Sequence, residues 1–189
     1  MKLLGLSGKA GAGKDSAFLI LKRLLGDRVV RVAFADGVKA EAMAVGWNGL
    51  KDEAGRRLLQ EIGAGRREQD PSYWIVSAFK RMATLPADSI VVISDARYKN
   101  EAMVIREAGG ALWRIERTNP DMTPFDNGLS PEAKAHPSET DLDNYVGFQA
   151  RLFASNLEEL EVAVTDAAAM HELGREDRRE VGAGGEVEA

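Results

Sequence analysis

The chain has 189 residues, of which 44% are hydrophobic and 29% are charged, and this composition fits one globular domain with its own core. Its formal net charge of -5 argues against a general nucleic-acid-binding protein, which usually has a basic face. The sequence has no cysteine, which excludes disulfides and thiolate metal sites. We find no signal peptide and no apolar run long enough to span a membrane. We therefore expect a soluble cytoplasmic protein whose partners are neither membranes nor nucleic-acid polymers.

A glycine-rich turn follows the first apolar run, Leu3–Leu6, which predicts a buried strand. The turn reads GKAGAGKDS and matches the P-loop pattern G-x-x-x-x-G-K-[ST], except that Asp15 replaces the hydroxyl residue. Inward-pointing backbone N–H groups, the next helix N-terminus and the Lys14 cation together predict a site for polyphosphate. A carboxylate also suits Mg²⁺, so Asp15 is a candidate metal ligand. The residues expected to bind the triphosphate are Gly8, Lys9, Ala10, Gly11, Ala12, Gly13, Lys14, Asp15 and Ser16.

Helix and strand patterns alternate along the rest of the chain. The predicted strands after the first are 29–34, 90–94 (IVVIS), 111–116 (ALWRIE) and 146–153. The predicted helices include 15–25, a helix beginning at 35–36, 55–62, one opening at Asp70-Pro71, 101–108 and 157–170. Strands joined by long crossovers pair in parallel, so we predict a three-layer α/β fold with a central parallel sheet of about five strands flanked by helices.

Charged residues follow two of the predicted strands. Asp95 and Arg97 come after strand 90–94, and Arg117 comes after strand 111–116. Because the carboxyl ends of parallel strands meet at one edge, Asp95 is expected beside the P-loop, where it would serve Mg²⁺. We expect Arg66 and Arg67 to reach the same edge. A P-loop facing several arginines indicates phosphoryl transfer to an acceptor that already carries a phosphate.

Two segments interrupt the alternation of strands and helices. The helical stretch at about 47–84 is a predicted insertion that holds the acceptor. The segment at about 118–137 contains four of the six prolines and is a predicted lid over the reacting groups. We assign residues 1–171 to one kinase domain. The tail, 172–189, alternates charges and then glycines, and we expect it to be disordered.

Six blocks of sequence occur in the order seen in phage-type deoxynucleoside monophosphate kinases, and the chain resembles this family over most of residues 1–160. The blocks are GKAGAGKDS (8–16), FADGVK (34–39), DPSYW (70–74), ISDARYKNEA (93–102), GGALWRIER (109–117) and HPSETDLDNY (136–145). The resemblance implies a P-loop kinase fold, ATP and Mg²⁺ as cofactors, and a place in deoxynucleotide biosynthesis. The reaction would convert a deoxynucleoside monophosphate to the diphosphate. The partners would be small nucleotides, and a homodimer is left open.

The resemblance also implies roles for individual residues. Arg66 or Arg67 would hold the acceptor phosphate, and Trp74 would stack on its base. The candidate catalytic residues are Lys14, Asp95, Arg97 and Arg117. The candidate substrate-binding residues are Asp36, Lys39, Arg66, Arg67, Trp74, His136 and Glu139, and the candidate metal ligands are Asp15 and Asp95. The sequence departs from the family at 155–157, where Ser-Asn-Leu replaces an Asn-Asn-Gly-like turn, so the mode of adenine recognition stays open.

Other functions fit part of this pattern. A P-loop kinase for phosphomevalonate or dephospho-coenzyme A would use a similar loop and a similar strand-ending Asp with a nearby Arg. A non-enzymatic nucleotide-binding module would bind ATP without releasing ADP to any small acceptor, and it would not need the arginines on the acceptor side. A GTPase is not indicated, because the sequence has no base-reading motif of the Asn-Lys-x-Asp kind.

Overall fold

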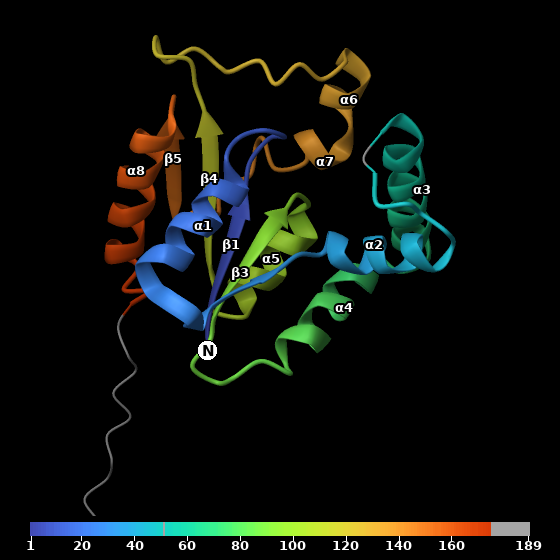
Figure 1. The fold of residues 1–189 in the computed structure, drawn as a ribbon, viewed down its shortest axis with the longest axis horizontal. Helices are drawn as coiled ribbons and strands as arrows, with labels where there is room; N and C mark the ends of the chain where they lie inside the picture. Colours follow the sequence, from blue (N-terminus) through green and yellow to red (C-terminus); the bar gives the residue numbers. More distant parts are fainter. Residues whose placement is uncertain (51, 175–189) are drawn as a thin grey trace, which may run out of the picture.

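The computed structural model describes residues 1–50 and 52–174, and its centre is one sheet of five parallel strands (Figure 1). The strand order is β2-β3-β1-β4-β5, so β1, which leads into the P-loop, has two strands on either side. The strands are β1 (Lys2–Ser7), β2 (Val29–Val32), β3 (Ile90–Ala96), β4 (Ala111–Arg117) and β5 (Ala150–Ala154). The predicted parallel sheet of five strands is confirmed.

Helices cover both faces of the sheet and complete the predicted three-layer α/β fold (Figure 1). On one face α1 (Lys14–Leu25) packs against α8 (Leu157–Met170), and α5 (Lys99–Glu107) lies on the other. The remaining helices are α2 (Ala35–Ala44), α3 (Glu53–Gln69), α4 (Tyr73–Met82), the short α6 (Pro131–Ala135) and α7 (Pro137–Thr140), and the 3₁₀ turn η1 (Gly26–Arg28). No helix in the described part of the chain is long and apolar enough to cross a membrane.

The core consists of two apolar clusters, one on each face of the sheet. Leu4, Leu6 and Trp113 belong to the cluster under α1 and α8. The other cluster joins the opposite face to α4 and α5. Gly5 of β1 faces α5, and a Cβ there would lie 2.8 Å from the Ile105 side chain. The glycine therefore lets α5 pack closely against β1.

Several boundaries differ from the predictions by a few residues, and three of the differences concern the site or the core. The helix expected over 55–62 continues to Gln69, so the polar cluster 63–69 forms the last turns of α3. The last strand begins at Ala150 and not at residue 146, and the side-chain oxygen of Gln149 just before it accepts the Leu112 N–H at 2.7 Å. Leu173 is 4% exposed in the core under α1, so packing extends beyond residue 171. Most of the predicted tail, 175–189, lies outside the described residues.

Candidate functional site

The turn from β1 to α1 has the backbone that the P-loop pattern predicts. Gly8, Gly11 and Gly13 have φ values of 150°, 75° and 101°. Left-handed φ values favour glycine, and a Cβ at Gly8 would lie 2.5 Å from the Ile115 carbonyl oxygen. Gly13 is also the N-cap of α1, so the first free N–H groups of that helix face the turn. The local geometry is suited to an anion with several oxygen atoms.

Lys14 lies across the turn. Its Nζ donates to the carbonyl oxygens of Gly8 and Lys9 at 2.7 and 2.8 Å. Burial of the ammonium group, together with the nearby Arg97 cation, lowers the pKa of Lys14 to about 8. Among the residues that the structure describes, the Lys14 ammonium group has carbonyl partners and no carboxylate bonded to it. A phosphate would both replace these carbonyl partners and stabilise the charge.

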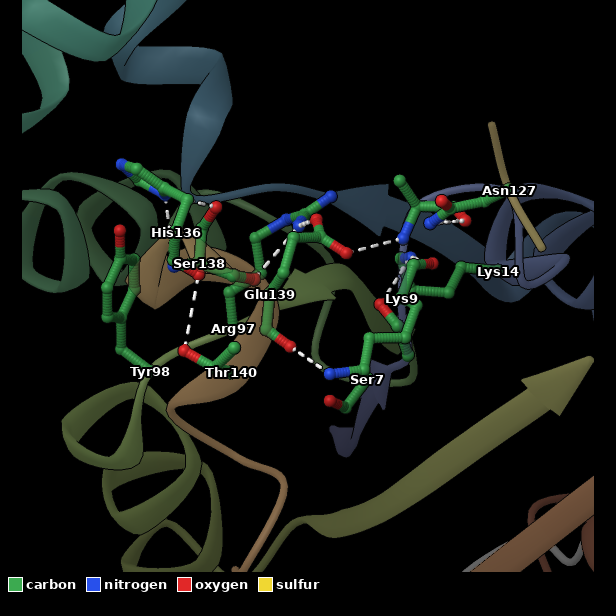
Figure 2. Close-up of polar contacts among 12 residues, drawn as sticks. Ser7, Lys9, Lys14, Arg97, Tyr98, Asn127, His136, Ser138, Glu139 and Thr140 are labelled. Atoms are coloured by element: carbon green, nitrogen blue, oxygen red, sulfur yellow. Dashed lines mark hydrogen bonds and ion pairs between the residues drawn. The ribbon is translucent and has the colours of Figure 1, made fainter. Parts of the chain in front are cut away.

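A carboxylate of the HPSETDLDNY block sits on the P-loop (Figure 2). The Ala10 N–H donates to Glu139 Oε2 at 2.8 Å, and the other carboxylate oxygen pairs with the Arg97 guanidinium. Arg97 also donates to the Ser138 carbonyl at 3.0 Å. Glu139 is 9% exposed. One buried carboxylate thus joins the phosphate-binding turn to the arginine that follows β3.

A second ion-pair cluster lies next to the contact between Glu139 and the P-loop. Arg114 of β4 is 7% exposed and donates to Asp143 Oδ1 at 2.9 Å and to Ser7 Oγ at 3.2 Å. Lys9 Nζ lies 2.6 Å from Asp143 and also donates to the Glu139 carbonyl at 2.5 Å. Sequence analysis missed Arg114 and Asp143. The only signals were a charge inside an apolar strand and a second acidic position after Glu139.

Asp95 is fixed at the end of β3. Its two carboxylate oxygens accept the N–H groups of Phe34 and Ala35 at 2.8 and 2.9 Å, so it caps the entry to α2. Burial raises the pKa of this carboxyl, and the backbone hydrogen bonds oppose that shift. Asp95 and Asp15 both act electrostatically on the Lys14 ammonium group, which places both carboxylates at the P-loop.

A cavity of about 550 Å³ opens on the Arg97 side of the P-loop, between α2, α3 and the starts of α5 and α7. Its basic wall includes Lys39, Arg67 and Arg97, and its apolar wall includes Phe34 and Val38. Other lining residues with polar groups are Arg56, Gln60, Glu68, Asp95, Tyr98, Glu101, His136 and Ser138. The cavity combines cations near the P-loop with an apolar wall contributed by the helical insertion.

Arg67 is held at the wall of this cavity. Its Nη2 lies 3.6 Å from Glu101 Oε1, and its guanidinium lies over the Tyr98 ring at 4.4 Å from the ring centroid. The Glu101 carboxylate also accepts the Arg97 N–H at 2.8 Å and is 2% exposed. Burial, together with the nearby Asp95 carboxylate, raises the pKa of Glu101 to about 7.

Two more cavities adjoin the P-loop on the opposite side. The larger, of about 580 Å³, lies under the predicted lid and is lined by Lys9, Arg117, Phe125 and Phe153 among others. The smaller, of about 230 Å³, is lined by Gly11 to Gly13 and by residues 154–157. Ala12 and Arg117 line both. The Arg117 guanidinium stacks on the Phe125 ring, 3.9 Å from the ring centroid.

Five predicted residues line the 550 Å³ cavity, and a sixth contacts the P-loop. The five are Lys39, Arg67, Asp95, Arg97 and His136, and the sixth is Glu139, while Lys14 and Asp15 belong to the P-loop itself. The expectation that all four arginines meet is wrong. Arg117 lines the two cavities on the other side of the P-loop, while Arg66 pairs with Glu41 at 3.0 Å and does not line any of these cavities.

Two further predictions are corrected by burial and pairing. Trp74 cannot stack on a base, because it is 2% exposed in the core and its Nε1 donates to the Gly63 carbonyl at 3.1 Å. Asp36 accepts the Ala33 N–H at 3.0 Å and pairs with Arg81 at 3.2 Å, so it ties α2 to α4 and does not line the cavity. Both residues hold the insertion against the sheet.

No family model and no curated protein matches the sequence. Among solved structures, a shikimate kinase from Aquifex aeolicus vf5 is similar at 15% identity and a TM-score of 0.48, with 92% of this chain and 99% of that chain covered. A gluconokinase from Sinorhizobium meliloti 1021 gives 14% identity and a TM-score of 0.46, with 91% and 96% covered. A Cys556Ala mutant of the APS kinase CysC from Mycobacterium tuberculosis is similar at 16% identity and a TM-score of 0.39, with 89% of this chain and 96% of that chain covered. These likenesses are too distant to indicate a substrate.

Proposed function

We propose that this protein transfers the γ-phosphate of ATP to the phosphate of a deoxynucleoside monophosphate. The observation that carries the proposal is the position of Arg97. Its guanidinium is joined through Glu139 to the P-loop N–H of Ala10, and the same side chain lines the 550 Å³ cavity. An arginine that faces a phosphate-binding turn and a cation-lined cavity together suits transfer between two phosphates.

The donor would lie along the P-loop. The N–H groups of the turn and of the start of α1 would bind its β- and γ-phosphates, with Lys14 on the outer oxygens. The nucleoside would extend toward the two cavities that meet at Arg117. Arg117 thus belongs to the donor side in this proposal.

The acceptor would fill the 550 Å³ cavity, whose volume is in the range of small-ligand sites, about 300–1,000 Å³. Its phosphate would lie between Arg67 and Arg97, and its base against Phe34, Val38 and the α3 wall. Arg67 and Gln60 lie seven residues apart on α3, about 10 Å along the helix axis. That spacing allows one helix to contact both the phosphate and the base of a nucleotide.

In this reaction the protein would need only to position the two phosphates and to neutralise their charge. An oxygen of the acceptor phosphate, already an anion, would attack the γ-phosphorus and form a new P–O bond. The bond from that phosphorus to the β,γ-bridging oxygen would break, and its electron pair would leave with ADP. Lys14 and Arg97 would neutralise the charge on the transferred group, so no general base is required.

The residues at the P-loop fit a Mg²⁺ ion bound mainly through phosphates and water. The described part of the chain contains no group of three or more His, Cys, Asp or Glu side chains that would hold a metal on its own. Asp15 and Asp95 both act electrostatically on the Lys14 ammonium group, as Glu139 does, and each Asp95 oxygen keeps a lone pair beyond its backbone hydrogen bond. When bound, Mg²⁺ would neutralise charge on the triphosphate.

A coupled assay of ADP release tests this function. The panel is the four common deoxynucleoside monophosphates, their ribonucleotide counterparts, phosphomevalonate and dephospho-coenzyme A, with Lys14→Ala as the inactive control. We expect saturable ADP release with at least one deoxynucleoside monophosphate, and loss of that activity by orders of magnitude in the control. ADP release only with phosphomevalonate or only with dephospho-coenzyme A as the acceptor would overturn the choice of acceptor. ATP binding with no ADP release for any acceptor would indicate a binding module.

A further inference from the structure

Glu139 uses the partners that a transferred phosphate would need. Its carboxylate accepts an N–H of the P-loop, from Ala10, and pairs with Arg97. A buried carboxylate needs such partners, and Glu139 is 9% exposed. A triphosphate in the P-loop would require the same N–H and guanidinium groups. Two anions cannot share them, because like charges a few ångströms apart repel strongly in a partly buried site.

We propose that the Glu139 carboxylate occupies the position of the transferred phosphate until a triphosphate displaces it, and that this exchange couples the donor site to the acceptor cavity. The inference rests on the proposed function only in that a triphosphate binds the P-loop. Arg97 would exchange the carboxylate for the γ-phosphate. Glu139 is thus a positioning residue that keeps Arg97 at the P-loop.

The coupling follows from the residues that flank Glu139. His136 and Ser138 line the 550 Å³ cavity, and the Ser138 carbonyl accepts from Arg97 at 3.0 Å. Movement of Glu139 away from Ala10 would therefore change the wall of the acceptor cavity (Figure 2). Asp143, four residues further on, stays anchored by buried Arg114 and by Lys9. The segment would thus move at its Glu139 end, where the hydrogen bond from Lys9 to the Glu139 carbonyl would be given up, while it remains attached at Asp143.

Affinity for inorganic tripolyphosphate, measured by calorimetry without any acceptor, tests the displacement. We expect Glu139→Gln to bind tripolyphosphate about fivefold or more tightly than the unmodified chain, because no internal anion competes. Glu132→Gln, in the exposed first turn of α6, is the matched control and should leave the affinity unchanged. Equal or weaker binding by Glu139→Gln would overturn the proposal. A gain in affinity is not expected from structural damage.

Amide hydrogen exchange distinguishes displacement from simple charge removal. In the unmodified chain, tripolyphosphate should slow exchange at residues 9–14 and speed it at 138–143, where Glu139 leaves its partners. Slower or unchanged exchange at 138–143 would mean that the segment closes on the ligand or does not respond, and would overturn the proposal. Because tripolyphosphate carries neither base nor acceptor, this result stands apart from the acceptor assay. If the protein phosphorylates no nucleotide but shows both the affinity gain and the exchange pattern, the proposed function is overturned and the displacement of Glu139 is not.

Discussion

Arg67 lies 3.6 Å from the buried carboxylate of Glu101, which ties the last turns of α3 to the start of α5. The neighbouring Arg66 points elsewhere and pairs with Glu41 of α2. Two adjacent arginines on one helix therefore have different surroundings, and only Arg67 lines the acceptor cavity. This difference provides a matched pair of variants.

Arg67→Ala should raise the KM for the acceptor by about tenfold or more, because a hydrogen bond to a charged group contributes about 1.5–3 kcal/mol. The KM for ATP should change little, since Arg67 does not line the cavities on the donor side. Arg66→Ala should leave both constants within about twofold, because its ion pair with Glu41 is partly exposed to solvent and Arg66 does not line the acceptor cavity. Steady-state kinetics of the two variants makes the comparison. Equal effects of the two substitutions would count against the acceptor site.

Arg97→Ala should lower kcat by about 10²–10³-fold, the usual cost of removing one group that stabilises developing charge. ATP affinity, measured by calorimetry, should fall much less, because the P-loop N–H groups and Lys14 remain. Arg97→Lys should recover part of kcat, since it keeps the charge but not the planar geometry. An effect confined to the binding constant for ATP would contradict the role given to Arg97.

The pH dependence of ATP binding should reflect Lys14. Burial lowers the pKa of this lysine to about 8, so the ammonium form that attracts phosphate is lost as pH rises through that value. Affinity for ATP should be nearly constant from pH 6.5 to 7.5 and should fall toward about tenfold per pH unit above 8, with proton uptake on binding. Calorimetry in buffers of different ionisation enthalpy measures both quantities. The Lys14→Met variant should lose this dependence, and a dependence that persisted in it would assign the titration to another group.

Trp74→Phe tests the assignment of this side chain to the core. The free energy of unfolding should fall by about 1–3 kcal/mol, because the indole hydrogen bond to Gly63 is lost and the packing is reduced. The KM values for all nucleotides should stay within about twofold. Denaturant titration and steady-state kinetics provide the two measurements. A large change in acceptor KM at unchanged stability would restore a base-contacting role.

Local patterns predicted much of this fold. The apolar run at 90–94 and the amphipathic pattern at 157–170 correspond to β3 and α8, because buried strands and helices need apolar residues at fixed spacing. The P-loop was visible because its backbone requires glycines at fixed positions. The end of α3 was missed, since Gly63 and Gly65 weaken the helical pattern while contacts between helices extend it.

The site was only partly predictable, because pairing between distant residues has no local pattern. Trp74 has the same amphipathic spacing whether its ring packs in the core or faces a ligand, and only the tertiary structure shows that it is buried. The contact of Glu139 with Ala10 joins residues 129 positions apart. Likewise, nothing in the order of the residues separates Arg66 from Arg67, whose side chains diverge by the rotation of one residue along α3.

The central claim is that donor and acceptor phosphates meet in one crevice between Lys14 and Arg97. A dinucleoside pentaphosphate that links adenosine to a deoxynucleoside spans both proposed sites, and calorimetry can compare its affinity with that of ATP. We expect the linked compound to bind about 10²-fold or more tightly than ATP, because the second site is then filled at high effective concentration. We also expect Arg67→Ala to remove most of this gain. Binding no tighter than that of ATP would contradict the claim that the two phosphates share one crevice.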